Sequence, residues 1–524
     1  MNESSPNRNR RRTSSRSSRR EERSQQITAQ LPPAIQAIGP LDIMTTEVRD
    51  LIIHQAETVL EEIGVDFVDT PESSKLWKAA GANVSIQSDN DKGLRERIRI
   101  PRGLTKKLMR TLPQAFDQAA RNPARSVHIG DKSTVFAPVY GPPFVNDLDK
   151  GRRYGTLEDF QNFVKLVYQL PTLHHSGGTV CEPVDVPVNK RHLDMVYAHF
   201  KYSDKPIMGS VTAPWRATDT VEMARLVFGE QFVDQNACLL SLININSPLS
   251  FDANMLQTLE VYASANQAVI VSPFIISGAM APSTPAGVMV QATAETLVGL
   301  AHTQLIRPGA PAIFGTFCAA MSMQSGAPTF GMPEPSLVTY GMAQIARHLK
   351  VPFRSGGALN ASKVPDSQAA YESLSSLFCT VTSGVHFVLH AAGWLEGGLV
   401  SSYEKLLMDA DQLGAMQKMM RGLETDANGL AMDAIRDIGP GGHHLGTAHT
   451  QSNYLNAFYR AHLHDSGSYE QWLSEGSTDM AQRANTRWKS MLASYEPPAI
   501  DESVDDALKA YVAKRKNELP DSPY

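Results

Sequence analysis

Short apolar segments alternate with longer amphipathic segments from about residue 134 onward. A short apolar segment between turn residues predicts a strand, and apolar positions three and four residues apart predict a helix. Eight predicted strands begin about 30 to 43 residues apart, near 134–139, 173–180, 206–212, 238–245, 268–276, 311–317, 352–358 and 385–391. Strands that alternate with helices predict a parallel sheet with right-handed crossovers.

Residues typical of helix starts precede several of the predicted helices. Thr156 and Asp159 have the spacing of a capping box, and Pro285 and Pro335 suit a first helical turn. Eight strand–helix units favour an α/β fold, a closed (β/α)8 TIM barrel with helical N-terminal and C-terminal additions. An open doubly wound sheet is the alternative.

The segments that flank the predicted barrel differ from it in pattern. Residues 1–30 are rich in Arg and Ser and lack apolar periodicity, which predicts a disordered tail. Residues 31–130 are predicted to be a mainly helical extension, in which an apolar stripe ends at Gly64. The catalytic barrel is expected over 131–422, and a polar, helical extension over 423–524.

The composition, with 42% hydrophobic and 20% charged residues, indicates a large buried core. The formal net charge is −5; residues 1–23 hold eight Arg and three Glu, so the rest of the chain carries −10. A mildly acidic body predicts no nucleic-acid binding. No apolar run reaches the roughly 18–20 residues that span a bilayer, so we expect no membrane association.

The four cysteines, Cys181, Cys238, Cys318 and Cys379, lie far apart and form no CxxC motif. This pattern predicts reduced thiols and a cytoplasmic protein. The N-terminal residues lack the apolar stretch of a secretory signal. An organellar transit peptide, which is also rich in Arg and Ser, is the alternative.

In a (β/α)8 barrel the active site lies on the loops where the strands end. Those loops are rich in aromatic, Met and Gly residues and contain few carboxylates. Such a lining suits a cationic ligand with an apolar body, because aromatic faces attract quaternary ammonium groups by about 0.5–2 kcal/mol per contact. The alternative role of each aromatic side chain is core packing, and that of Glu334 is to stabilise a helix N-terminus.

Recognised motifs for metal, nucleotide or nucleophilic chemistry are absent from the sequence. No HExxH, GxxxxGK[ST] or GxSxG segment occurs. We therefore expect no directly bound metal. A zinc site drawn from Cys181, Glu182 and Cys318 is the alternative, since strand ends converge in a barrel.

Five segments, in order along the chain, resemble the trimethylamine methyltransferase family, the corrinoid-dependent methyltransferases for methylamines and betaines. They are GVMVQATAETLVGLAHTQLIRPGAP (287–311), GAPTFGMPEP (326–335), SKVPDSQAAYE (362–372), YEKLLMDAD (403–411) and DIGPGGHHLGTAHT (437–450). The resemblance covers about residues 40 to 497 and implies a (β/α)8 barrel, which agrees with the strand count.

The resemblance implies methyl transfer from an N-methylated amine to the Co(I) form of a corrinoid (cobalamin). A separate corrinoid protein carries this cofactor, so a partner supplies it. A quaternary ammonium is already an activated leaving group, so the enzyme need only place an N-methyl carbon in line with the nucleophile. We also expect a homo-oligomer.

The chain departs from the family pattern in two places. Some members carry pyrrolysine near the end of strand 7, in the region corresponding to 356–363, where this chain has GGALNASK. The absence of pyrrolysine favours a glycine betaine-like quaternary amine over trimethylamine. Ser322 and Gln324 stand where an Asp- and Arg-containing loop is expected in many relatives, so the substrate differs from theirs.

The candidate substrate site lies on the loops after predicted strands 6, 7 and 8. It contains aromatic residues for the cationic group, carboxylates that balance its charge, and basic residues for a betaine carboxylate. The aromatic residues are Phe317, Phe330 and Trp394, and the carboxylates are Glu334 and Glu396. The basic residues are Lys363 and His390. No catalytic residue is predicted. The alternatives are a methylamine as donor, a zinc-dependent barrel methyltransferase or lyase, and a betaine-binding protein without catalytic activity.

Overall fold

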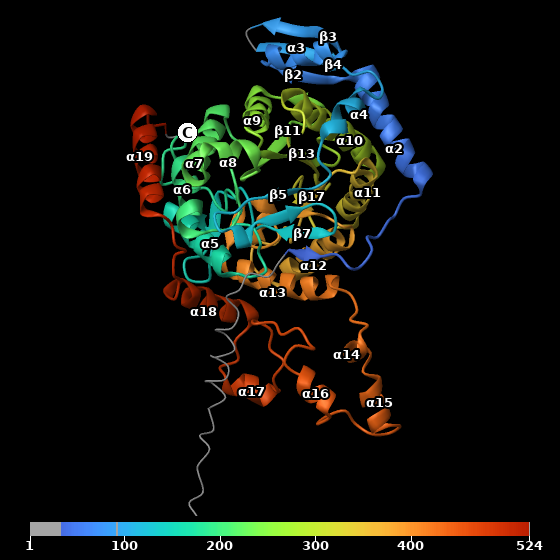
Figure 1. Cartoon of the computed structure of the whole chain (residues 1–524), viewed down its shortest axis with the longest axis vertical. Helices are drawn as coiled ribbons and strands as arrows, with labels where there is room; N and C mark the ends of the chain where they lie inside the picture. Colours follow the sequence, from blue (N-terminus) through green and yellow to red (C-terminus); the bar gives the residue numbers. More distant parts are fainter. Residues whose placement is uncertain (1–32, 91–92, 523–524) are drawn as a thin grey trace, which may run out of the picture.

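The computed structural model describes residues 33–90 and 93–522. The predicted disordered tail, residues 1–30, lies outside the described residues. The rest forms a mixed α/β fold in which helices surround a central sheet, with further segments added at both ends of the chain (Figure 1).

Seven parallel strands form the central sheet, in the order β7-β18-β17-β14-β13-β11-β10. Each lies at a predicted strand, which confirms the parallel α/β pattern. A short strand, β1 (Ala34–Ile35), pairs antiparallel with β7 at one side. The parallel strands are β7 (Ser133–Phe136), β10 (Ile207–Met208), β11 (Leu239–Ile245), β13 (Ala268–Ile276), β14 (Ala312–Gly315), β17 (Phe353–Gly356) and β18 (Phe387–Leu389).

The predicted strand at 173–180 contains no regular strand, but residues 174–177 lie between β7 and β10. The amides of His174 and His175 donate to the carbonyl of Phe136 at 2.9 and 3.2 Å. On the other side, the amide of Ser176 donates to Pro206 O, and the amide of Met208 donates to Gly177 O. Both outer strands of the sheet therefore hydrogen-bond to the same segment.

A helix follows each strand position. Thr156 and Asp159 form the predicted capping box at the first of these helices, and Pro285 begins the helix after β13. The eight helices are α5 (Leu157–Gln169), α6 (Arg191–Tyr202), α7 (Pro214–Phe228), α9 (Ala253–Ser264), α10 (Pro285–Ile306), α11 (Pro333–Leu349), α12 (Ser367–Thr382) and α13 (Tyr403–Met420).

Side chains alternate between two apolar clusters along the strands, as strand geometry requires. Phe136 and Leu239 belong to the large cluster that includes the surrounding helices. Val135 and Leu240 belong to a separate cluster made almost entirely of strand residues, on the inner side of the sheet. The candidate site lies beyond this inner cluster, where the strands end.

The N-terminal extension contains more β structure than predicted. A four-stranded sheet has the order β12-β2-β4-β3, in which β12 comes from the barrel segment, and it lies at the top of Figure 1 with helix α3 packed on it. The sequence predicted a mainly helical extension, because the pairing of β2 with β4 is not visible in the local pattern. The elements are α2 (Thr46–Thr58), β2 (Val65–Val68), α3 (Pro71–Ala80), β3 (Asn83–Asn90), β4 (Gly93–Arg99) and β12 (Ser250–Phe251).

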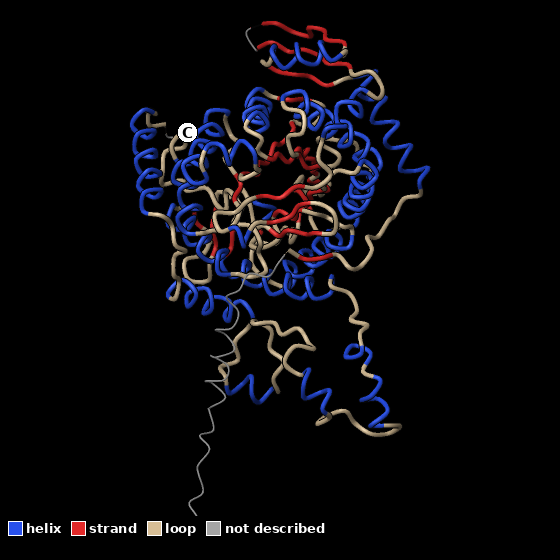
Figure 2. The backbone as a smooth tube through the Cα atoms, viewed as in Figure 1, coloured by secondary structure: helices blue, strands red, loops and turns tan. Residues whose placement is uncertain are grey.

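The C-terminal extension has two parts. Helices α18 (Met480–Ala493) and α19 (Glu502–Glu518) pack on the body, α18 against α13 and α5 and α19 against α6 and α7. Residues 421–478, which we call the arm, hang below the body in Figure 1 and consist largely of loop in Figure 2. Among the described helices, none is both long and apolar enough to cross a membrane.

Candidate substrate-binding site

Four of the seven predicted site residues meet in one buried cluster, which we call the aromatic box: Phe317, Phe330, His390 and Trp394. The ring of Phe317 lies 6.1 Å from Phe330 and 6.0 Å from Trp394, and Phe330 lies 5.7 Å from Trp394. The imidazole of His390 lies 4.5 Å from the Trp394 ring. All four side chains are at most 6% exposed. The box is therefore a closely packed group of aromatic rings at one end of the sheet.

Ends of neighbouring strands bring the box together. Phe317 opens β15 (Phe317–Met321), directly after β14, and Phe330 follows β16 (Pro328–Thr329), the strand that pairs with β15. His390 follows β18, with a left-handed φ of 61° that turns the chain toward Trp394. Because parallel strands end on the same side of a sheet, segments far apart in the chain meet there.

Trp394 is held in place on two sides. Its indole N–H donates to the carbonyl of Asn360 at 3.0 Å, and the Asn360 amide group donates to the Trp394 carbonyl at 2.6 Å. A Cβ on Gly398 would lie 2.4 Å from the Trp394 ring, so a side chain there would displace the indole. The ring orientation is therefore fixed before any ligand binds.

A buried polar network supports Asn360 from behind. Ser373 Oγ accepts from Asn360 Nδ2 at 3.1 Å and from Lys405 Nζ at 2.9 Å. Lys405 also contacts Asp409, whose second oxygen accepts the amide N–H of Gly393 at 2.9 Å. The network thus connects α12 and α13 to both loops that carry Asn360 and Trp394.

Arg354 on β17 is a site residue that the sequence analysis missed. Its guanidinium lies 6.0 Å from the Phe317 ring centre, its Nη1 donates to Ser272 Oγ and Thr316 O, and its Nε has no partner within the described chain. The side chain is 1% exposed, and burial lowers its pKa to about 9. Among the described residues no carboxylate pairs with it, so a buried positive charge lies beside the Phe317 ring without a counter-charge.

A signal for Arg354 was present in the sequence, since an arginine stood inside a predicted apolar strand. Phe353 packs toward the helices, so the alternation of strand side chains turns Arg354 toward the inner side. Burying such a cation costs several kcal/mol unless an anion accompanies it. The position therefore suits an anionic group of a ligand.

His390 and Tyr140 contribute neutral polar groups beside Arg354. The backbone N–H of Tyr140 donates to His390 Nδ1 at 3.3 Å, which leaves Nε2 to carry the proton. Burial, together with the charge of Arg354, holds the pKa of His390 well below its usual value. Burial raises the pKa of Tyr140 to about 12, so its hydroxyl stays protonated.

The three remaining predicted residues do not join the box. Glu396 forms an ion pair with Arg152 at 2.8 Å. Lys363 is exposed and donates to the carbonyl of Ala361 at 2.9 Å, two residues back along its own loop. Glu334 is exposed in the first turn of α11, where its charge interacts favourably with the helix N-terminus.

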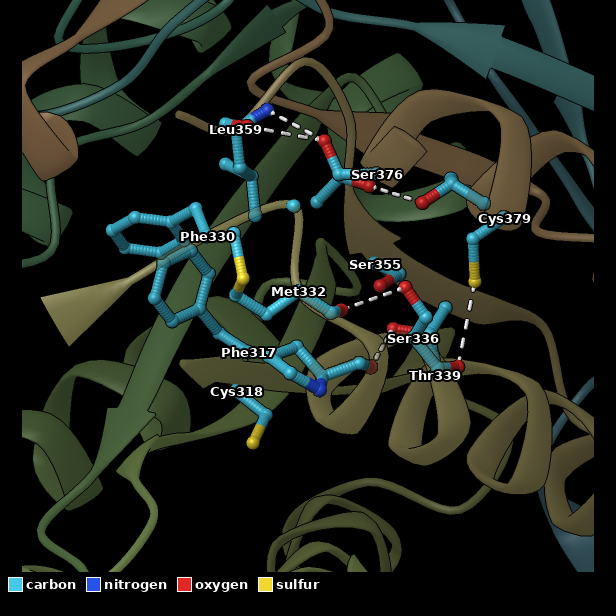
Figure 3. Close-up of a pocket in the computed structure, with 14 residues that line it drawn as sticks. Phe317, Cys318, Phe330, Met332, Ser336, Thr339, Ser355, Leu359, Ser376 and Cys379 are labelled. Carbon is cyan, nitrogen blue, oxygen red and sulfur yellow. Dashed lines mark hydrogen bonds between the residues drawn. The ribbon is translucent and has the colours of Figure 1, made fainter. Parts of the chain in front are cut away.

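A small cavity of about 20 Å³ lies behind the box (Figure 3). Phe317 and Phe330 line it together with Ser336 of α11, Ser376 of α12 and Ser355 of β17. Because Ser355 follows Arg354, it points to the outer side of the sheet. The cavity therefore lies between the sheet and the helices rather than within the box.

The cysteines have the properties of buried structural thiols. All four are free and buried, and burial raises the pKa of Cys318 to about 11 and that of Cys379 to about 12. Within the described chain, no group of three His, Cys, Asp or Glu residues is arranged to hold a metal ion.

Comparison with known proteins identifies the family. The model of the family described as trimethylamine methyltransferase (MTTB) matches residues 9–520. The chain belongs to this family. The family predicted from the five sequence segments is thus confirmed.

Among members and relatives of the trimethylamine methyltransferase family, a glycine betaine methyltransferase of Desulfitobacterium hafniense is 39% identical over 485 residues, which cover 92% of this chain and 99% of the relative. A proline betaine:corrinoid methyltransferase of Eubacterium limosum is 26% identical over 90% of this chain and 96% of its own length. The solved monomethylamine methyltransferase of Methanosarcina barkeri aligns with a TM-score of 0.46 at 10% identity, covering 87% of this chain and 94% of its own.

Proposed function

We propose that this protein demethylates a betaine: it transfers a methyl group from the quaternary nitrogen of glycine betaine or a close analogue to the Co(I) corrinoid of a partner protein. The observation that carries this proposal is the contact between the aromatic box and Arg354, a buried cation without a carboxylate partner among the described residues. A glycine betaine methyltransferase at 39% identity supports the same substrate class.

The aromatic box suits the trimethylammonium end of such a substrate. A quaternary nitrogen has no N–H to donate, so it is recognised through ring faces and through apolar contact with its methyl groups. The ring centres of Phe317, Phe330 and Trp394 lie within 6.1 Å of one another. Preorganised rings of this kind bind without a large ordering cost.

Arg354 and His390 suit the carboxylate end. One methylene group separates the ammonium from the carboxylate in glycine betaine, so the two subsites have to be adjacent. The Arg354 guanidinium lies 6.0 Å from the Phe317 ring, and His390 has an Nε2–H to donate beside Trp394. Arg354 thus takes the role first assigned to Lys363, whose ammonium group is exposed. Trimethylamine has no carboxylate and would leave Arg354 uncompensated.

The residues of this chain bind, orient and shield the substrate, and no proton transfer is required of them. When bound, the partner's corrinoid supplies the Co(I) nucleophile that accepts the methyl group. The electron pair of the broken C–N bond stays on nitrogen, so the product is the neutral tertiary amine, dimethylglycine for glycine betaine. Phe274, exposed near the end of β13 and stacked on Phe317 at 5.1 Å, and Met323, exposed on the loop after β15, provide apolar surface beside the box for the approach of the corrinoid.

We further infer a closed (β/α)8 barrel and a cytoplasmic location. Residues 174–177 hydrogen-bond to both outer strands, which supports closure at the eighth strand position. Four buried free thiols support a reducing compartment.

The proposal is tested by methyl transfer from a panel of amines to free Co(I)-cobalamin, measured by absorbance. The panel contains glycine betaine, proline betaine, carnitine, choline and trimethylamine. We expect turnover with one or more of the carboxylated quaternary amines and at least tenfold lower kcat/KM for choline and trimethylamine. A preference for trimethylamine would overturn the substrate assignment, binding without transfer would favour a betaine-binding protein, and stoichiometric zinc in the purified protein would favour the zinc-dependent alternative.

A further inference from the structure

Asn244, near the end of β11, places an unpaired amide group on the inner side of the sheet. Leu240 and Leu242 of the same strand belong to the inner apolar cluster, and side chains alternate along a strand, so Asn244 also faces inward. The side chain is partly exposed, and its amide group has no hydrogen-bond partner within the described chain. Both of its N–H groups are therefore available to a ligand.

Asn244 lies beside the residue that holds Arg354. In the pairing of β11 with β13, Asn244 is the register partner of Ser272, whose hydroxyl oxygen accepts from Arg354 Nη1 at 3.2 Å. In the sheet β11 lies on one side of β13, and β17, which carries Arg354, lies on the other, beyond β14. Because neighbouring strands are about 4.8 Å apart, the Asn244 amide and the Arg354 guanidinium approach Ser272 from opposite sides.

Gly315 of β14 gives Arg354 the room to reach Ser272. It is the register partner of Arg354, and because Ile313 belongs to the inner cluster, position 315 faces inward as well. A Cβ there would lie 2.8 Å from Ser272 Cβ and 2.7 Å from Val271 O, closer than side chains pack. Without a side chain at this position, the guanidinium lies across β14 and presents its charge to the space in front of β11 and β13.

A ligand can reach this space from the strand ends. Exposure rises along β13, from Ser272, which is fully buried, to Phe274, which is 40% exposed two residues later. Phe274 also stacks on Phe317 at 5.1 Å, so the polar pair of Asn244 and Arg354 lies next to the aromatic box. A ligand whose cationic end contacts the rings would therefore place a nearby anionic group between Asn244 and Arg354.

We propose that Asn244 binds the substrate carboxylate together with Arg354 and thereby helps to select carboxylated quaternary amines. This role rests on the proposed betaine demethylation. A carboxylate has two oxygens with about four acceptor sites, and a single guanidinium does not satisfy all of them. Asn244 Nδ2 would donate to one oxygen, while Arg354, whose Nε has no partner within the described chain, donates to the other.

The amide side chain at position 244 also suits an anionic ligand because it is neutral. Asn244 adds a hydrogen-bond donor without cancelling the charge of Arg354. An Asp at this position would pair with Arg354 and would repel a carboxylate. The charge at position 244 thus decides whether this space accepts an anion.

Two substitutions test this role by calorimetric titration of the full-length protein with glycine betaine and with choline, which has no carboxylate. Asn244→Leu removes the donor, so we expect the dissociation constant for glycine betaine to rise about tenfold and that for choline to stay within about twofold. Asn244→Asp adds a negative charge in nearly the same shape. Glycine betaine should then bind about 30- to 100-fold more weakly, and choline about three- to tenfold more tightly.

Matched controls make the same chemical changes at Asn254, which is exposed in the first turn of α9. Asn254→Leu and Asn254→Asp should leave both dissociation constants within about twofold, as expected for surface substitutions. Circular dichroism and thermal unfolding should show the wild-type fold for all four variants. A residue that only supports the fold would change the affinity for both ligands in the same direction, so the opposite shifts expected for Asn244→Asp separate binding from support.

The possible results distinguish this role from the proposed function. If the wild-type protein binds no carboxylated quaternary amine, the proposed function fails, and the role of Asn244 fails with it. The role of Asn244 alone is overturned if the wild-type protein binds glycine betaine and Asn244→Leu or Asn244→Asp keeps that affinity. It is also overturned if either variant weakens choline as much as glycine betaine. Either variant is sufficient on its own for this decision.

Discussion

The aromatic box and the arm contain the same kinds of side chain in opposite settings. In the box, the rings of Phe330 and Trp394 are at most 4% exposed and are fixed by loops that continue directly from strands. In the arm, Phe458 is 78% exposed and lies on a loop between two short helices. Rings that are ordered before binding suit a small ligand, and rings that are exposed on a weakly structured segment suit a protein surface.

The setting also decides what a polar neighbour can do. Next to the box, Arg354 is buried and its charge is not screened by water. A ligand anion placed there is therefore attracted strongly to the guanidinium. On the arm, Arg436 pairs with Asp433 in solvent, and such a pair contributes little. The comparison predicts that variants in the box alter substrate binding and that variants in the arm do not.

Arg354→Leu should have the largest effect. We expect glycine betaine binding to weaken by on the order of 3 kcal/mol, about 100-fold, because the substrate carboxylate loses its charged partner in a buried site. The thermal midpoint should hold or rise, because Leu replaces an unpaired buried cation. Calorimetric titration and thermal unfolding measure the two effects. Arg354→Lys keeps the charge without the planar fork and should fall between Leu and wild type. Choline has no carboxylate. An equal loss of affinity for choline would therefore show that Arg354 maintains the shape of the site and does not bind the substrate carboxylate.

Trp394→Ala and Phe330→Ala should come next. Each should weaken binding of a quaternary amine by roughly 1–3 kcal/mol through lost cation–π contact and lost burial. Leu399→Ala is the control, since Leu399 lies on the same loop and is half-exposed. Wild-type affinity of both aromatic variants for every quaternary amine tested, with the fold intact by circular dichroism, would contradict the box as the cation site.

Asn360→Ala should have a smaller effect that acts through Trp394. The variant removes the hydrogen bond to the Trp394 carbonyl, so the indole is less well oriented, and we expect a KM about five- to tenfold higher. A double-mutant cycle with Trp394→Phe measures the coupling. If Asn360 acts by positioning the indole, the two effects will not add; full additivity would mean that Asn360 acts on something else.

The positions of strands and helices could be predicted because their signals are local. Thr156 with Asp159 marks a helix start within four residues, and the apolar runs at 238–245 and 268–276 contain β11 and β13. The meeting of Phe317 and Trp394 was also predictable, since it follows from the rule that strand ends converge. These inferences needed only the order of elements along the chain.

The polar half of the site could not be predicted in the same way. Whether Arg354 points inward depends on the register of β17 in the sheet, and a shift by one residue would reverse it. Lys363 was assigned to the carboxylate because of its position on loop 7, but the course of that loop leaves its ammonium exposed. Loop paths and sheet register arise from long-range packing, which local sequence patterns do not contain.

The smallest expected effect is that of pH on substrate affinity. A nearly constant affinity between pH 6 and 8 would distinguish a buried site from an exposed one. Burial and the charge of Arg354 hold the pKa of His390 well below its usual value, so the imidazole stays neutral down to pH 6. The pKa of Arg354 is lowered to about 9, so its guanidinium stays charged up to pH 8. A betaine carboxylate is ionised throughout, since α-carboxyl groups titrate near pH 3.5.

Calorimetry should therefore give dissociation constants within about twofold from pH 6 to 8, and weaker binding only above pH 9 as Arg354 loses its proton. Affinity that rises steadily as the pH falls from 8 to 6 would show that His390 titrates at its ordinary pKa and becomes a second cation for the carboxylate, which would contradict the neutral, donating imidazole assigned to this site.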